Sequence, residues 1–247
     1  MLQRLTQTWQ RWSGGAANKP FASIEVWAKG SDFRFRRAKD NLRFVVEAAP
    51  NAPPLRLEWG PSQRSYIAPN EMRIRMDLGL PNSLQMLLLS RPLMERLEKE
   101  TFERYTQDAQ TMIDVSTPEE MRWLAMFTQA DLSFDKPLRA RFCAFGADPS
   151  TALAWIKGTL GAQLGRATQD LLAAEPPFAL MTMRGKVYLR MQLDDPTAAQ
   201  VVQCLQLFDA ATQSALLLTE TCPRAMVNGP PPRAPRGKPK RKSTMNR

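Results

Sequence analysis

This chain of 247 residues contains no histidine. Histidine is the side chain that most readily gains or loses a proton near neutral pH, and it is also the commonest metal ligand. Its absence excludes Ser-His-Asp and Cys-His nucleophile pairs, imidazole general bases, and zinc sites that need a nitrogen ligand. No Gly-rich loop follows a predicted strand, so a phosphate cradle is missing too. We therefore expect no catalytic, cofactor-binding or metal-binding residues and predict that the protein is not an enzyme.

Cysteines are few, and long apolar runs are missing. Cys143, Cys204 and Cys222 are far apart and odd in number, which is typical of a reducing compartment and not of a disulfide framework. Apolar runs such as 86–89 are far shorter than the ~20 residues that cross a bilayer. The first twelve residues lack the continuous apolar core of a secretory signal. We expect a soluble cytoplasmic protein of bacterial type without an integral membrane segment.

The net charge of +10 is unevenly distributed. Residues 1–43 hold nine Lys or Arg and three acidic residues, for a net charge of +6. Residues 44–228 have a net charge of −3, from eighteen basic and twenty-one acidic residues. Residues 229–247 hold seven basic residues and no acid. Because this last segment is also Pro-rich and nearly free of large apolar side chains, we predict a disordered basic tail over 223–247.

Alternation of apolar and polar residues dominates 21–90 and predicts strands with one buried face. The predicted strands are 24–27, 33–36, 42–47, 55–59 and 72–76, and 84–89 is a buried strand or the approach to a helix. We expect a mostly antiparallel sheet of about five or six strands. The segment before it, 1–20, is predicted to be an amphipathic helix and a linker.

Helical periodicity replaces this alternation over 91–130, which we expect to be a helical connection. Pro92 is well placed in a first helical turn. Thr117-Pro118-Glu119-Glu120 has the pattern of a capping box in which Pro118 is the first helical residue.

The last third, 131–222, predicts a β-α-β-β-α unit. Its elements are a strand at 138–145, a helix to about 174, a hairpin of 178–183 with 187–193 across Arg184-Gly185-Lys186, and a helix to about 218. Asp148 and Asp195, each followed by proline, are the expected N-caps of the two helices. The sequence thus predicts an α+β fold. It leaves open whether the two sheet regions form one domain or two.

Three patterns suggest chemistry but have simpler explanations. Ser133 and Lys136 match the Ser-x-x-Lys pattern of penicillin-recognising enzymes, but Pro137 predicts that Lys136 is extended. The carboxylate pairs Glu119/Glu120 and Asp194/Asp195 are explained as negative charge at helix N-termini. The third pair, Asp131/Asp135, lies in a predicted loop without polar neighbours.

Candidate interaction residues lie in three places. The strand at Arg34, Arg36 and Arg37 alternates arginine with phenylalanine, and alternation places the rings toward the core and the arginines toward water. Arg73 and Arg75 extend this basic face if their strand is close by. The polar loop 59–66, which contains Arg64 and Tyr66, has aromatics at both ends, and we expect Tyr66 to anchor it unless it is a site residue. The basic tail adds Lys238, Lys240, Arg241 and Lys242.

We expect a non-catalytic protein–protein interaction module. The first alternative is a nucleic-acid-binding protein that uses the basic tail and the 34–39 strand, with affinity that falls steeply with salt. The second is peripheral attachment to an anionic membrane surface through Leu2, Leu5, Trp9 and Trp12, which share one face of the predicted N-terminal helix.

Overall fold

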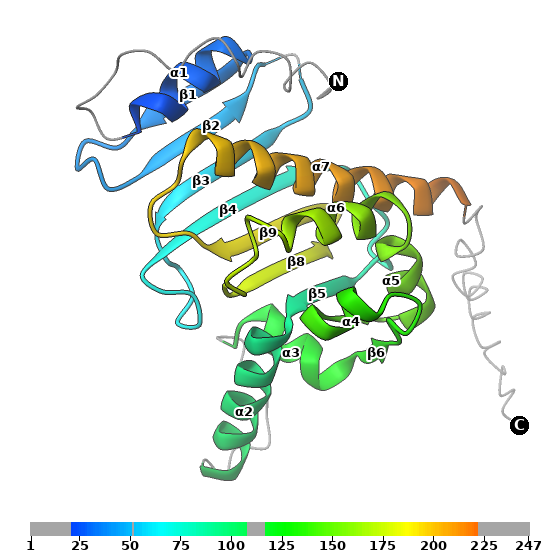
Figure 1. Cartoon of the computed structure of the whole chain (residues 1–247). Coiled ribbons are helices and arrows are strands. Elements are labelled where there is room, and N and C mark those ends of the chain that lie inside the picture. The colour runs from blue at the N-terminus through cyan, green and yellow to red at the C-terminus, as the bar shows by residue number, and fades with distance from the viewer. Residues whose placement is uncertain (1–20, 51, 108–116, 222–247) are drawn as a thin grey trace, which may run out of the picture.

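The computed structural model describes residues 21–50, 52–107 and 117–221, which form one antiparallel sheet of nine strands with seven helices (Figure 1). The strands are β1 (Phe33–Arg37), β2 (Phe44–Ala48), β3 (Leu55–Pro61), β4 (Asn70–Asp77), β5 (Met86–Ser90), β6 (Thr128–Ala130), β7 (Phe142–Gly146), β8 (Phe178–Met183) and β9 (Lys186–Gln192). The helices are α1 (Ala22–Gly30), α2 (Arg91–Gln107), α3 (Glu119–Met126), α4 (Lys136–Arg141), α5 (Pro149–Ile156), α6 (Thr159–Ala167) and α7 (Ala198–Thr221). The predicted α+β class is confirmed.

The strands follow the spatial order β1-β2-β3-β4-β9-β8-β5-β7-β6. The first four strands therefore pair in the order of the sequence. Strand β9, from the C-terminal part of the chain, then pairs with β4, and their register runs from Glu71 opposite Gln192 to Asp77 opposite Lys186. The hairpin of β8 and β9 lies between β4 and β5. Both predicted sheet regions belong to one sheet, and β5 is separated from the N-terminal strands that precede it.

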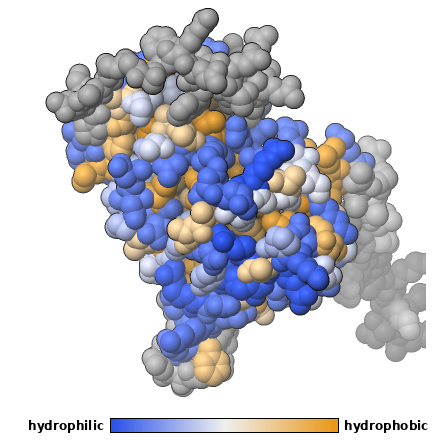
Figure 2. Space-filling model, in the orientation of Figure 1, coloured by the Kyte–Doolittle hydropathy of each residue, from blue (hydrophilic) through white to orange (hydrophobic). Residues whose placement is uncertain are grey.

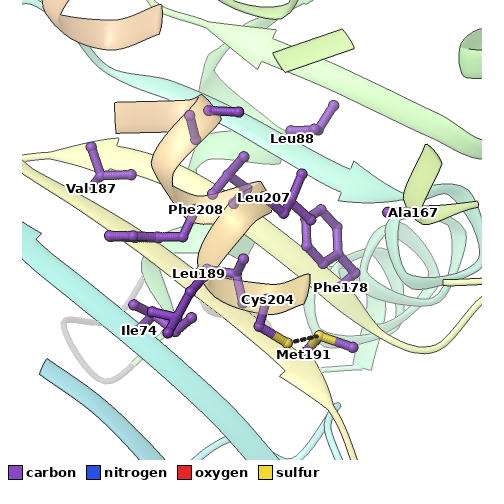
Figure 3. Close-up of a cluster of buried hydrophobic side chains, with 14 of the residues drawn as sticks. Ile74, Leu88, Ala167, Phe178, Val187, Leu189, Met191, Cys204, Leu207 and Phe208 are labelled. Atoms are coloured by element: carbon purple, nitrogen blue, oxygen red, sulfur yellow. Dashed lines mark hydrogen bonds between the residues drawn. The ribbon is translucent and has the colours of Figure 1, made fainter. Parts of the chain in front are cut away.

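One face of the sheet is covered by helices along its whole width (Figure 1). The long helix α7 crosses the middle of this face, and Figure 3 shows Cys204, Leu207 and Phe208 of α7 against the inward side chains of β8 and β9. The Sγ atom of Cys204 lies 3.6 Å from the Sδ atom of Met191. Alternation in the strands explains this core, because every second residue of each strand points toward the helices.

The other face of the sheet is covered over only half its width. The outward residues of β5, β7 and β8 are apolar and form a second core with α2, α3 and the loop after β3; its buried members include Leu87, Leu89 and Phe145 from the strands and Leu97 from α2. The outward residues of β1, β2, β3, β4 and β9 are mostly charged. Within the described residues no helix covers them except at the β9 border, where Glu120 of α3 lies 3.8 Å from Arg190 and Tyr188 packs against the second core. This uncovered half is the open face of the sheet.

Three local predictions were wrong. Residues 24–27 lie in α1, because Ile24 and Ala28 are one helical turn apart and both are completely buried in the core. The predicted strand 138–145 begins only at Phe142, since α4 occupies the four residues before it. The helix expected to continue to about 174 is broken between α5 and α6 at Gly158, whose φ of 81° is in the left-handed region.

The predicted helix caps were partly right. Asp148 caps α5, where its carboxylate accepts hydrogen bonds from the backbone N–H groups of Ser150 and Thr151. Asp195 does not cap α7, which begins at Ala198; the hydroxyl of Thr197 instead accepts a hydrogen bond from the N–H of Gln200. The predicted hairpin is confirmed, but its turn is one residue shorter than predicted. It consists of Arg184 and Gly185, with φ values of 50° and 78°, because Lys186 already pairs with Met183.

Within the described residues, one helix has the length and composition of a membrane span, at Ala198–Glu220. Of its most apolar stretch, 61% is buried inside the protein, as expected for the central helix of a core. The outer surface on the helix side mixes hydrophilic and hydrophobic residues, and hydrophilic ones cover most of its lower half (Figure 2).

Candidate functional site

A continuous series of ion pairs crosses the open face from β1 to β9. Its members, in spatial order, are Arg36, Glu47, Arg56, Glu58, Arg73, Glu71, Arg190, Glu120 and Arg64, and we call it the ion-pair ladder. Positive and negative side chains alternate along it. Neighbouring strands in an antiparallel sheet place directly opposite and diagonal side chains close together, so period-two charge on five strands becomes one connected network.

The ladder is exposed at one end and buried at the other. At the β1 end, the Nη2 atom of Arg36 lies 2.5 Å from Glu47, and the Arg36 side chain is 66% exposed. At the β9 end, Glu71 is completely buried and Glu120 is 1% exposed. The network therefore runs from solvent at the sheet edge to the second core beside α3.

Glu71 holds the buried end of the ladder together. Its Oε1 atom accepts a hydrogen bond from Arg190 at 2.5 Å, and its Oε2 atom accepts from the backbone N–H of Gln63 at 3.0 Å. The Oε2 atom also accepts from the hydroxyl of Ser62 at 3.2 Å and from Arg73 at 3.4 Å. Four donors compensate for the burial of this carboxylate, and they fix the loop after β3 to the sheet.

Glu58 is the carboxylate at the centre of the open face. Burial alone would raise the pKa of Glu58, but the hydrogen bond from Arg56 and the charges of Arg56, Arg73 and Arg75 together lower it below its ordinary value. The hydrogen bond to Glu58 in turn raises the pKa of Arg56. The ladder is therefore fully charged at neutral pH in this region.

Arg34 and Arg75 lie on the same face but outside the ladder. Both side chains are exposed, and neither has an ion pair within 4.0 Å in the described part of the chain. Arg34 lies directly opposite Glu47 in the strand register, but Glu47 pairs with Arg36 and Arg56 instead. These two arginines give the open face cationic groups that are available to a partner.

Tyr66 is buried at the border between the open face and the second core. It is 1% exposed, and its hydroxyl lies beside Glu120 and Arg64 without a hydrogen bond of good geometry among the described residues. Burial is the largest cause that raises the pKa of Tyr66 above its ordinary value, and the negative charge of Glu120 adds to it. The Oε2 atom of Glu120 and the Nε atom of Arg64 also have no hydrogen-bond partner. The aromatic ring therefore anchors the loop against the second core, together with its neighbour Ile67.

The structure brings six of the candidate interaction residues to the open face or its border: Arg34, Arg36, Arg64, Tyr66, Arg73 and Arg75. Arg37 points to the helix side, where it pairs with Glu25 at 3.5 Å. The basic-tail candidates Lys238, Lys240, Arg241 and Lys242 lie outside the described residues, as do Leu2, Leu5, Trp9 and Trp12 of the proposed membrane-binding helix.

Four ladder carboxylates and two arginines were missed by sequence reasoning: Glu47, Glu58, Glu71, Glu120, Arg56 and Arg190. For most of them a signal existed, because each occupies a polar position of an alternating strand. Glu120 had no such signal; it lies in the first turn of α3, as predicted for negative charge at a helix N-terminus, but its burial and its ion pairs were not predicted. The predicted capping box is absent, because α3 begins at Glu119 and its N-cap is Pro118, which has no side-chain acceptor. The Glu120 carboxylate instead lies 3.5 Å from Arg64 and 3.8 Å from Arg190.

The patterns that suggested chemistry are used structurally. Asp135 is the N-cap of α4 and accepts a hydrogen bond from the N–H of Leu138. Lys136 is therefore helical, and its prediction as extended was wrong. The side chain of Ser133 donates to Asp131 at 2.8 Å and so closes a local turn. No group of three potential metal ligands occurs among the described residues.

The two cysteines in the described residues are free and buried. Burial raises the pKa of the Cys204 thiol to about 12, and burial is also the main cause that raises the pKa of Cys143. Both sulfurs are therefore protonated at neutral pH and are poor nucleophiles.

Comparisons of this chain with models of protein families, with curated proteins and with solved structures find no match.

Proposed function

We propose that this protein is a non-catalytic interaction module that binds an acidic surface of another protein through the open face of its sheet. The observation that carries the proposal is that half of one sheet face has no helix covering it within the described residues and bears six arginines and Lys186 against three glutamates and Asp77 from its own strands. Arginine is enriched in protein interfaces, where its planar group binds carboxylates through two parallel hydrogen bonds.

The ladder supports this function by holding the face in one arrangement. Arg56 and Arg73 are fixed by carboxylates on both sides, and their side chains are only 35% and 14% exposed. A partner therefore meets side chains that have already lost most of their conformational freedom, which lowers the entropy cost of binding. Arg34 and Arg75 supply the unpaired charges, and complementary charge gives a fast and selective encounter.

The described side chains that most often carry out catalysis are engaged elsewhere, which supports a non-catalytic role. The ladder carboxylates are held by arginines, and the cysteine thiols are buried and protonated. We keep the cytoplasm as the proposed location, where free thiols such as these remain reduced.

Nucleic-acid binding is the second candidate, because the same arginines suit phosphates. Phe33 and Phe35 do not contribute stacking to it, since both rings pack against the core on the helix side. Tyr188 is then the one aromatic ring on the β1, β2, β3, β4 and β9 strands that alternation places on the open face within the described residues. A nucleic-acid partner would have to bind through charge alone.

The test is affinity capture from a bacterial lysate with the full chain as bait, analysed by mass spectrometry. The double variant Arg34→Glu with Arg75→Glu should reduce the recovery of a specific partner by about tenfold or more, because it converts attraction into repulsion. The matched control is Lys136→Glu with Arg166→Glu, which changes the charge equally at exposed residues of α4 and α6 on the helix side.

Each outcome has a distinct meaning. Equal loss in both double variants indicates a nonspecific charge effect and contradicts the proposal, as does equal recovery with the parent. Loss of recovery after nuclease treatment of the lysate assigns the open face to nucleic acid.

A further inference from the structure

Helix α3 already places an acidic side chain at the border of the open face. Its Glu120 is 1% exposed, and the carboxylate lies 3.5 Å from Arg64 and 3.8 Å from Arg190 of β9. Glu119, one residue earlier, pairs at 3.3 Å with Arg184 in the turn between β8 and β9. On this side of the sheet, the chain therefore pairs glutamates of a helix with arginines of the strands.

Arg75, farther along the same face, has no such carboxylate. It is exposed and lies directly opposite Arg56 of β3, and like charges in that position destabilise a sheet. The nearby carboxylates are already engaged. Asp77 of the same strand pairs with Lys186 at 3.4 Å, and Glu58 of β3 pairs with Arg56 and with another arginine of β4. A carboxylate from outside the sheet would therefore be stabilised beside Arg75.

Arg75 and Arg34 belong to one row of side chains that runs across the strands. In the register, Arg34 is opposite Glu47, Glu47 is opposite Arg56, and Arg56 is opposite Arg75. Three strand spacings separate the two arginines that lack ion pairs, which is roughly 14 Å. Tyr188 continues the row on β9, where it packs against the second core. The row therefore offers two available cations and ends at an aromatic ring.

An α-helix suits this row better than an extended segment does. The interior of a sheet face offers side chains but no backbone partners, so a segment that lies on it must satisfy its own backbone hydrogen bonds, as a helix does. Side chains on one helix face are about 5–6 Å apart, close to the ~4.8 Å between strands. A helix that crosses the strands therefore presents about one side chain to each of them. Helices α2 and α3 already cover the other half of this side of the sheet.

We propose that the open face takes up an acidic helix of a partner protein, which lies beside α3 across β4, β3, β2 and β1. Its carboxylates bind Arg75 and Arg34, and an apolar side chain at its end contacts Tyr188. This inference rests on the proposed protein-binding function and specifies the partner element. Glutamates two or three helical turns apart are separated by about 11 or about 16 Å, which brackets the spacing of the two arginines.

The test uses a fluorescently labelled helical peptide and measures its anisotropy with the full chain. The peptide is alanine-based, has a glutamate at each turn along one face and a leucine after the last glutamate, and is kept helical by a covalent staple on its opposite face. It should bind with affinity that falls as salt is added. A stapled peptide of the same composition, with the glutamates distributed around the helix, should bind about tenfold more weakly, because it cannot align its carboxylates with the row.

Protein variants and a charge exchange locate the peptide. Arg75→Glu and Arg34→Glu should each weaken binding about tenfold, because each places like charges side by side. Because the leucine lies at Tyr188, the glutamate nearest to it faces Arg75. Replacement of that glutamate by lysine should restore affinity for Arg75→Glu, which also shows that the variant is folded, and should not restore affinity for Arg34→Glu.

Lys136→Glu is the matched control, since Lys136 is exposed in α4 on the helix side. It changes the net charge equally and should leave the affinity within about twofold of the parent, because nonspecific charge effects at a distance are screened by salt.

Four results would overturn the proposal: no binding by the aligned helix, equal affinity of the peptide with distributed glutamates, equal binding by an extended peptide of alternating Glu and Val, or a charge exchange that restores both arginine variants alike. The capture experiment is separate. If its double variant still loses a partner while the helical peptide fails to bind, the acidic-surface function stands and only the helical partner element is wrong.

Discussion

Replacement of Glu71 tests whether the buried end of the ladder stabilises the fold. Glu71→Ala removes a fully buried carboxylate and leaves Arg190 and Arg73, whose side chains are 17% and 14% exposed, without their shared partner. Breaking a buried ion pair by removing one side costs about 3–5 kcal/mol, because the remaining charge is uncompensated. Arg73 keeps its pair with Glu58 at 3.2 Å, so we expect a cost near the lower limit, about 3 kcal/mol.

Two further variants show how much of this loss in stability comes from the charge of Glu71 and how much from its burial. Glu71→Gln preserves the volume and an acceptor for the N–H of Gln63, and it should cost about 1.5–3 kcal/mol, the usual contribution of hydrogen bonds to a charged group. Glu47→Ala is the control from the exposed half of the same ladder, since the Glu47 side chain is 26% exposed and its partner Arg36 is largely in solvent. It should cost about 1 kcal/mol or less.

The assay is equilibrium unfolding in urea, monitored by circular dichroism, with the free energies compared at a common m-value. A small domain with about 5–15 kcal/mol of stability remains folded after the loss of 3 kcal/mol, so all three variants can be measured. A cost for Glu71→Ala no greater than that for Glu47→Ala would refute the reasoning. It would mean that the four hydrogen bonds to Glu71 only offset the cost of burying it.

Three other predictions concern single side chains. Tyr66→Phe should change the free energy of unfolding by less than about 1 kcal/mol, because the hydroxyl makes no hydrogen bond of good geometry among the described residues; a larger loss in thermal melts would contradict this and would indicate a hydrogen bond from the hydroxyl to Glu120. Asp148→Ala should lower the free energy of unfolding by about 1 kcal/mol, because it removes the cap of α5. The hydroxyl and N–H groups of Thr151 and Ser150 lower the Asp148 pKa, so the parent should lose this contribution as the pH falls through the folded-state pKa of Asp148. The variant should show no such loss. Burial raises the Asp209 pKa, so the charged form of Asp209 destabilises the folded state above that pKa. Asp209→Asn should therefore raise the melting temperature at neutral pH. This gain should disappear as the pH falls below about 4, where Asp209 is protonated even in the unfolded chain. Equal pH profiles for this variant and the parent would be inconsistent with the burial of Asp209.

The sequence alone determined which strand faces are buried wherever alternation was strict. Phe33 and Phe35 were expected to face the core, and both rings pack against it, while Arg34 between them faces the open side. The Arg184-Gly185 turn and the Asp148 cap were equally predictable, because a positive φ and an N-cap depend on the residues of the turn itself.

Only the tertiary structure decided the identity of segments with two compatible patterns. Residues 24–27 alternate like a strand, but Ile24 and Ala28 also share a helix face, and their complete burial in the core favours the helix. Local spacing has no information about which neighbours are available, and packing overrides a weak local preference.

The candidate site shows the same division most clearly. Period-two charge placed Arg34, Arg73 and Arg75 on solvated strand faces, but the pairing of β4 with β9 made the ladder continuous. Glu120 has the sequence context of an exposed charge at a helix start, yet it is 1% exposed beside Arg64 and Arg190. A carboxylate can be buried there only because those two guanidinium groups, far away in the sequence, compensate its charge in space.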